Sequence, residues 1–202
     1  QIAELQRRLE TLTGDADPGI AARFAQARAA LDAGQLVEAD QLLADVAARD
    51  LAAIQQADAE AERRRLRAGE TIASRGQVAF VQADHLSAAA HYARAAEIVP
   101  QAARHARAQY ATWRGLALYR RSRLFAEVEP LRQSIAAYET ALTLWSRTSA
   151  PSDWASAQHN LGAALALLGA RGESGALEQA VAAYEAALTV RTREADPALW
   201  AA

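Results

Sequence analysis

An internal repeat constrains the fold of this chain more than any other feature. Residues 131–155 return, shifted by 46 positions, as residues 177–201, and about half of the aligned positions are identical. Repetition at a fixed period of a few tens of residues is typical of stacked-repeat folds, in which each unit buries its apolar face against its neighbours. The shared residues are Leu131, Gln133, Ala136, Ala137, Tyr138, Glu139, Ala141, Leu142, Thr143, Arg147, Pro151, Trp154 and Ala155, which recur as Leu177, Gln179, Ala182, Ala183, Tyr184, Glu185, Ala187, Leu188, Thr189, Arg193, Pro197, Trp200 and Ala201.

The composition favours helix and excludes several kinds of chemistry. About half of the 202 residues are apolar, aromatic residues are few, and Ala, Leu, Glu, Gln and Arg are abundant. Cysteine is absent, which excludes a disulfide framework, thiolate catalysis and a cysteine-based zinc site. No apolar run approaches the roughly 18 residues of a membrane span, and no signal segment opens the chain. These features predict a cytoplasmic protein.

Helical spacing of apolar residues predicts an all-α chain, and no segment alternates like a strand. Asp17 followed by Pro18 predicts an N-cap and a helix start, and the glycine-rich stretch 169–175 predicts a flexible turn. Residues 1–14 are expected to form a capping or coiled-coil helix. The further expected helices cover residues 18–33, 36–48, 51–82, 85–100, 102–124, 130–147, 154–168 and 176–194.

Laid over one another, the predicted hairpins resemble tetratricopeptide repeats. That family has a small residue where the two helices of a unit cross, then an alanine, an aromatic residue and another alanine on the second helix. The resemblance implies an α-solenoid of stacked antiparallel helix pairs with a right-handed superhelical twist, in which the aromatic fills the gap to the next unit. It covers about four hairpins in residues 15–202, with a further repeat beginning at the end. The matching residues are Ala27, Ala39, Leu43 and Val46; Gly76, Ala88, Tyr92, Ala95 and Pro100; Gly115, Ser134, Tyr138 and Ala141; and Asn160, Leu161, Gly162, Ala180, Tyr184 and Ala187.

The stretch 154–169, with its Trp-Ala-x-x-Gln-x-Asn-Leu-Gly type of motif, resembles a bacterial long-repeat variety of the family. The resemblance implies a sensing or scaffolding part of a larger signalling protein, so the chain is expected to be a segment of something longer. The 46-residue period exceeds the roughly 34 residues usual in the family, so the shape of the groove is not carried over.

In this family the first helix of each unit lines a concave groove, which here implies a partner-binding set of aromatic and hydrogen-bonding side chains. The family's carboxylate clamp of lysines and asparagines is missing, which disfavours capture of a chaperone C-terminus. The implied groove residues are Gln77, Phe80, Gln109, Thr112, Trp113, Tyr119, Arg120, His159 and Asn160.

A run of arginines is the second candidate surface. All 22 basic residues are arginine, and the net charge is −7 over residues 1–62, +8 over 63–132 and −3 over 133–202. Residues 104–123 hold six arginines and no acid, with aromatic residues interleaved. Guanidinium groups bind carboxylates or phosphates, so the run indicates an acidic protein partner, nucleic acid, or pairing within the solenoid. The anion-binding candidates are Arg104, Arg107, Arg114 and Arg121.

No pattern of catalytic residues is present, and the chain is expected to be neither an enzyme nor a cofactor protein. The four histidines do not pair at helical spacing, which disfavours a metal site. The stretch 169–175 lacks the Gly-Lys-Ser/Thr of a phosphate-binding loop, and no Gly-x-Ser-x-Gly occurs.

Three functional hypotheses remain. The first is a non-catalytic scaffold that binds a peptide, a protein or a neighbouring domain of its own polypeptide on the concave face. The second is a sensor of nucleic acid or of an anionic ligand that uses residues 104–123. The third is self-association through exposed solenoid ends.

Overall fold

A computed structural model describes residues 2–14 and 16–191 of the chain, and these residues form helices and turns without a strand. The fold is all-α, as predicted. The helices are α1 (Ile2–Gly14), α2 (Pro18–Asp32), α3 (Leu36–Val81), α4 (His85–Ile98), α5 (Arg104–Phe125), α6 (Val128–Leu144), α7 (Pro151–Ala170) and α8 (Ala176–Leu188).

The helices divide between two compact units, Gln1–Ala61 and Glu62–Ala202, with the boundary inside α3. In the first unit, α1 packs against α2, and Leu9, Phe24 and Leu31 are buried in a common core. The predicted start of α2 is confirmed. The Asp17 carboxylate accepts hydrogen bonds from the backbone N–H of Gly19 and of Ile20 at 2.8 and 3.1 Å, and Pro18 occupies the first helical turn.

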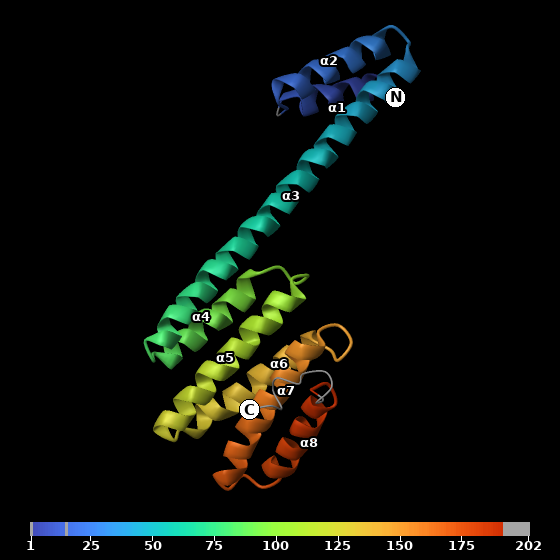
Figure 1. Ribbon diagram of the computed structural model, residues 1–202. Helices are drawn as coiled ribbons and strands as arrows, with labels where there is room; N and C mark the ends of the chain where they lie inside the picture. Colours follow the sequence, from blue (N-terminus) through green and yellow to red (C-terminus); the bar gives the residue numbers. More distant parts are fainter. Residues whose placement is uncertain (1, 15, 192–202) are drawn as a thin grey trace. The chain divides into compact units, whose positions relative to one another are not determined.

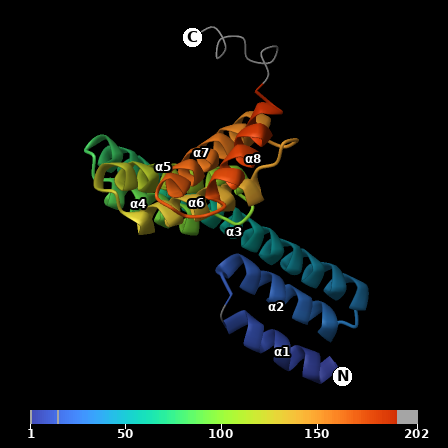
Figure 2. The same ribbon diagram turned by 90° about the horizontal axis from the view of Figure 1, so that it is seen from below.

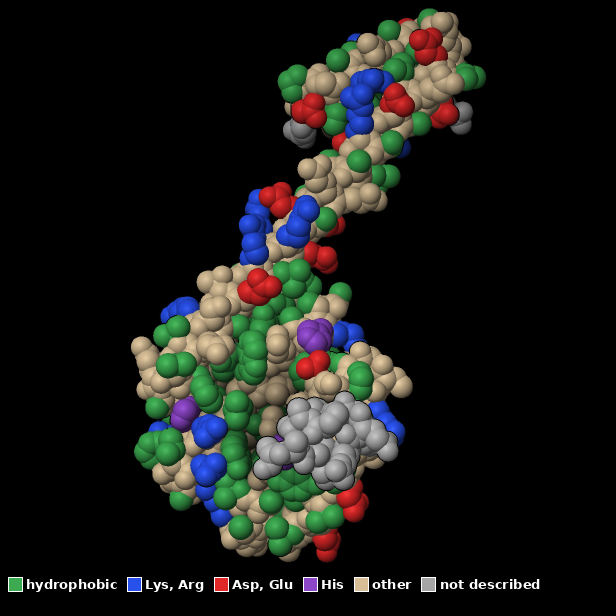
Figure 3. Space-filling model, viewed as in Figure 1, with side chains coloured by type: hydrophobic (Ala, Val, Ile, Leu, Met, Phe, Trp, Pro, Cys, Tyr) green, Lys and Arg blue, Asp and Glu red, His purple; other side chains and the backbone are tan. Residues whose placement is uncertain are grey.

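Helix α3 corrects the prediction for residues 36–82. The expected stop between residues 48 and 51 does not occur, and one helix of 46 residues replaces the two expected helices. No glycine or proline interrupts residues 36–68, so nothing in the backbone ends the helix there. Residues 47–65 are all exposed, and Figure 3 shows acidic and basic side chains close together along the middle of α3. Such spacing of charges supports a helix surrounded by water.

Several other helix ends differ from the expected positions by a few residues. Helix α6 begins two residues before Pro130, and α7 begins at Pro151, three residues earlier than expected. Helix α8 ends at Leu188, six residues earlier than expected. The repeat partners Arg193, Pro197, Trp200 and Ala201 lie outside the described residues.

In the second unit, each helix from α4 to α8 packs against the next one in the chain, as in a solenoid (Figure 1 and Figure 2). One core joins the end of α3 to α4 and α5 around Tyr92 and Leu118. Another joins α6, α7 and α8 around Leu131 and Leu165. Because each core forms between neighbours in sequence, most of the unit's apolar burial is local.

A glycine–tyrosine contact recurs in three successive hairpins. A Cβ atom placed on Gly76 would lie 2.8 Å from the Tyr92 ring, one on Gly115 would lie 2.7 Å from the Tyr138 ring, and one on Gly162 would lie 3.0 Å from the Tyr184 ring. Each glycine therefore sits where a first helix meets the tyrosine of its own second helix, and a side chain would clash there. The expectation that the aromatic fills the gap to the next unit is only partly right, because each tyrosine packs on the glycine of its own unit. Tyr92 reaches the next unit as well, since its ring lies 5.5 Å from that of Trp113 on α5 in a tilted arrangement.

The glycine-rich turn after α7 is tied to the preceding hairpin by Arg171. Its guanidinium donates to the hydroxyl and the backbone carbonyl of Ser122 at 2.7 and 2.8 Å, and to the carbonyl of Glu127 at 2.9 Å. Ser122 is fully buried. The prediction of a merely flexible turn misses this anchor, which joins the α5–α6 corner to the α7–α8 corner.

Candidate functional site

Two pockets lie between residues 70–81 of α3 and residues 105–124 of α5, and we call this surface the furrow between α3 and α5. The first pocket contains three of the predicted groove residues. We call it the Trp113 pocket. It has a volume of about 350 Å³ and is open to solvent. Gln77 comes from α3, and Gln109 and Trp113 lie one turn apart on α5, so the helical repeat places them on one side of that helix. The polar and aromatic side chains that line the pocket are Glu70, Ser74, Gln77, His105, Gln109, Tyr110 and Trp113.

Trp113 lines this pocket and also packs against the buried core of α3, α4 and α5. Its ring lies 5.5 Å from that of Tyr92 and 5.8 Å from that of Tyr110, in tilted arrangements that aromatic pairs favour. Burial, with a smaller effect from the charge of Glu70, raises the pKa of Tyr110, so this hydroxyl stays protonated at neutral pH. The pocket therefore offers a fixed aromatic surface beside two amide side chains, which can both donate and accept hydrogen bonds.

The second pocket, about 510 Å³ in volume, lies further along the same two helices. We call it the His85 pocket; it is lined by Phe80, Val81, His85, Arg120, Arg123 and Leu124. It unites the predicted residues Phe80 and Arg120. The rings of Phe80 and His85 are 5.2 Å apart, and burial, followed by the nearby charge of Arg120, lowers the pKa of His85.

The other predicted groove residues lie outside these two pockets. The Thr112 hydroxyl donates to the carbonyl of Ala108 in its own helix at 3.0 Å. The Tyr119 ring packs in the core of α6 to α8 and lies 5.8 Å from the Arg123 guanidinium. The His159 ring meets that of Tyr184 on α8 edge to face, at 5.4 Å between ring centroids, and burial lowers the pKa of His159. Its neighbour Asn160 is half-buried in α7, so the implied groove set divides between different places in the unit.

Arg121 is already paired within the chain. Its Nε and Nη2 donate to the two carboxylate oxygens of Glu127 at 3.0 and 2.6 Å, and its guanidinium lies 3.8 Å from the centre of the Phe125 ring. The hydrogen bond from Arg121 lowers the pKa of Glu127. A two-pronged pair of this kind is specific in geometry, so Arg121 has an internal role.

Arg104 and Arg107 also contact their own chain. Arg104 donates to the carbonyls of Thr143 and Leu144, which end α6, at 3.2 and 3.5 Å. Arg107 donates to the side-chain oxygen of Gln101 at 2.5 Å. Intramolecular pairing therefore occupies three of the four predicted anion-binding arginines.

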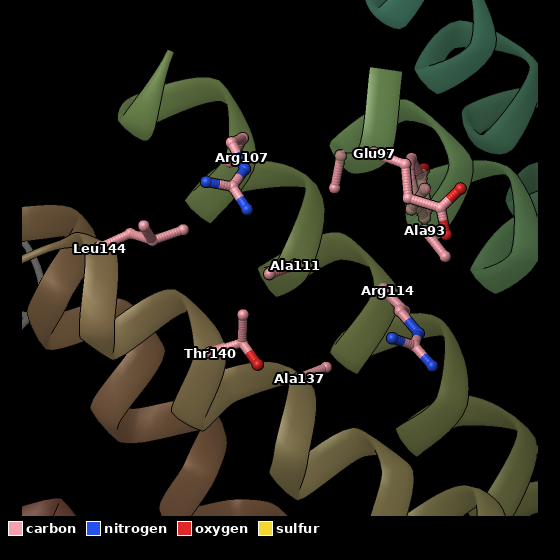
Figure 4. A pocket seen from close by; sticks show the side chains of 10 residues that line it. Ala93, Glu97, Arg107, Ala111, Arg114, Ala137, Thr140 and Leu144 are labelled. Carbon is pink, nitrogen blue, oxygen red and sulfur yellow. The ribbon is translucent and has the colours of Figure 1, made fainter. Parts of the chain in front are cut away.

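Arg107 and Arg114 share a pocket on the other side of α5. Figure 4 shows both side chains among those that line the pocket, with Ala137, Thr140 and Leu144 on α6 and Glu97 on α4. The pocket is small, about 200 Å³. The groove candidates Gln109 and Trp113 thus line a different pocket from the arginines that alternate with them, and the two sets do not form one surface.

Sequence reasoning missed some of the residues that complete the two furrow pockets. His105 accepts a hydrogen bond at Nδ1 from the Trp145 indole at 3.1 Å, and it also lines the Trp113 pocket, as does Glu70. His85 and Arg123 complete the second pocket. The spacing His105–Gln109–Trp113, with one helical turn between members, is a signal that could have added His105.

No protein-family model matches the chain, and no curated protein matches it. Among the described residues, no group of three or more His, Asp or Glu side chains could hold a metal ion. None of the described helices is both long and apolar enough to cross a membrane.

Proposed function

We propose that this chain is a non-catalytic interaction scaffold of the tetratricopeptide type, which binds a peptide or protein segment in the furrow between α3 and α5. The single observation that carries the proposal is the Trp113 pocket. It combines an aromatic side chain fixed by its neighbours with two amide side chains from two helices, open to solvent. Fixed aromatic residues beside adaptable polar groups are what binding surfaces use for affinity and specificity.

The recurring glycine–tyrosine contact supports the family part of the proposal. The contact appears in three hairpins at equivalent positions, as expected for stacked copies of one helix pair. The bacterial origin, the signalling context and the cytoplasmic location that the resemblance implies belong to the same proposal. The nucleic-acid alternative has less support, because Arg104, Arg107 and Arg121 have partners within the chain.

Peptide display against the purified chain tests this proposal. The selected peptides are synthesised with a fluorescent label, and their affinity for the wild-type chain and for the Gln109→Ala variant is measured by fluorescence anisotropy. Because Gln109 is half-buried in the Trp113 pocket, its loss should weaken binding at least about fivefold, which is the size of effect expected for an interface residue worth about 1 kcal/mol.

Arg114→Ala is the matched control, because Arg114 lies on the same helix but lines the pocket on the other side. Its affinity should stay within about twofold of the wild type. Equal affinity of Gln109→Ala and wild type for every selected peptide would remove the Trp113 pocket from the function. Affinity that instead falls steeply with salt would favour the anionic-ligand alternative.

A further inference from the structure

The His85 pocket has an unusual distribution of polar groups. Its three polar side chains are two guanidinium groups, which only donate hydrogen bonds, and one imidazole; its other three side chains, Phe80, Val81 and Leu124, are apolar. No carboxylate or amide lines it. A pocket of this composition complements a group that accepts hydrogen bonds and is attached to apolar surface.

The two arginines of the pocket have no acidic partner among residues 2–14 and 16–191. Arg121, which lies between them in sequence, forms a two-pronged pair with Glu127. For Arg123, by contrast, the neighbouring group is the Tyr119 ring at 5.8 Å, and Arg120 is exposed and within electrostatic reach of His85. Asp84, which precedes His85 in the chain, accepts a hydrogen bond from the Ser87 N–H at 3.1 Å as the cap of α4.

His85 supplies a second, independent observation. The residue is only 8% exposed, and its Nδ1 is buried without a hydrogen-bond partner. Burial lowers the pKa of His85, so the ring is neutral and carries one N–H. A buried donor left unpaired is costlier than an unpaired lone pair, which places that N–H on Nε2. His85 therefore contributes a neutral ring to the wall of the pocket.

We propose that the His85 pocket binds a carboxylate carried on an apolar body, with Arg120 and Arg123 pairing with the carboxylate and Phe80, Val81 and Leu124 covering the apolar part. A bare anion such as inorganic phosphate would leave the three apolar walls in contact with water, so apolar burial favours an anion carried on an apolar body. Arg120 and Trp113 are separated by seven residues of α5, about 10 Å along the helix. A peptide carrying the carboxylate could therefore fill both pockets within about three extended residues.

The site is tested by titrating the isotope-labelled chain with 3-phenylpropionate and following backbone and side-chain signals by NMR. We expect saturable shifts in α3, α4 and α5 around the pocket, with a Kd in the millimolar range, as is reasonable for a fragment of this size. The neutral amide of 3-phenylpropionate and inorganic phosphate should each bind at least about fivefold more weakly than 3-phenylpropionate does. Equal binding of the amide would show that the charge is not recognised, equal binding of phosphate would show that the apolar walls are not used, and absence of binding would also overturn the proposal.

Two substitutions locate the binding. Arg120→Gln and Arg123→Gln alter exposed side chains, so the fold should survive, and each should weaken 3-phenylpropionate at least about threefold. Arg114→Gln removes the same charge from the same helix but outside the pocket, and should leave the affinity unchanged; an equal loss there would show a general charge effect and contradict the site.

A last pair of titrations distinguishes the two sources of such a group. The capped tripeptide acetyl-Leu-Asp-Leu-amide is compared with 3-phenylpropionate. Tighter binding of the tripeptide assigns the pocket to a peptide partner, and tighter binding of the free acid assigns it to a small organic acid; either supports the site. Failure of both at the His85 pocket would overturn this proposal while leaving the Trp113 pocket, and the function proposed from it, untouched.

Discussion

Tyr138→Ala should lower the free energy of unfolding of residues 62–202 by about 3–5 kcal/mol, the range observed when a buried large aromatic is truncated. The ring of Tyr138 is 1% exposed and rests directly on the backbone of Gly115. Its removal leaves a cavity between α5 and α6 that the surrounding helices cannot easily fill. Urea unfolding, followed by circular dichroism at several protein concentrations, measures the change.

Two further variants test separately the Tyr138 hydroxyl and the close approach of α5 and α6 at Gly115. Tyr138→Phe keeps the ring and should cost about 1 kcal/mol or less. Gly115→Ala improves intrinsic helix propensity by about 1 kcal/mol, yet should still destabilise, because its Cβ would lie 2.7 Å from the Tyr138 ring. If Tyr138→Ala left the free energy of unfolding unchanged, or if Gly115→Ala raised it, the close packing of α5 on α6 at this point would be contradicted.

Arg171→Ala should lower the free energy of unfolding by about 2–4 kcal/mol, because hydrogen bonds to a charged group are stronger than neutral ones and its acceptors would remain buried. The variant removes three hydrogen bonds to Ser122 and Glu127 at once. Hydrogen exchange of the α5–α6 and α7–α8 corners, compared with urea unfolding, shows whether the loss is local or spreads through the unit.

Arg132→Ala provides the matched control. Arg132 also reaches the loop after α7, but through an exposed ion pair with Glu173 at 2.8 Å, and exposed pairs contribute about 1 kcal/mol or less. Arg171→Lys should recover only part of the stability, since an ammonium group cannot reproduce the planar fork. Equal effects of Arg171→Ala and Arg132→Ala would mean that the corner-to-corner bridge contributes little.

Much of the fold follows from local sequence signals. The helical spacing predicted the all-α fold, and Asp17 with Pro18 predicted the start of α2, because caps act within one helical turn. The continuity of α3 was missed although the sequence contained the signal, namely the absence of any helix breaker near residues 48–51. Gly69 and Gly76 do not end the helix; each lies where a neighbouring side chain leaves no room for a Cβ atom.

The candidate site was only partly predictable, for a different reason. Gln109 and Trp113 are one turn apart, so their common side of α5 follows from helix geometry. The pairing of Arg121 with Glu127 depends on how the α5–α6 corner folds. Arg171 reaches acceptors 44 and 49 residues away, and no local pattern encodes that contact. The buried, unpartnered Nδ1 of His85 is likewise visible only once the helices are packed.

Photo-cross-linking of a display-selected peptide tests the central claim, that the furrow between α3 and α5 binds the partner, most directly. The peptide carries a benzophenone side chain, and the cross-linked residues are identified by mass spectrometry. The proposed function predicts cross-links to residues 70–77 of α3 and 105–113 of α5, around the Trp113 pocket. Cross-links concentrated instead on α4 and α6, beside Arg107 and Arg114, would contradict it.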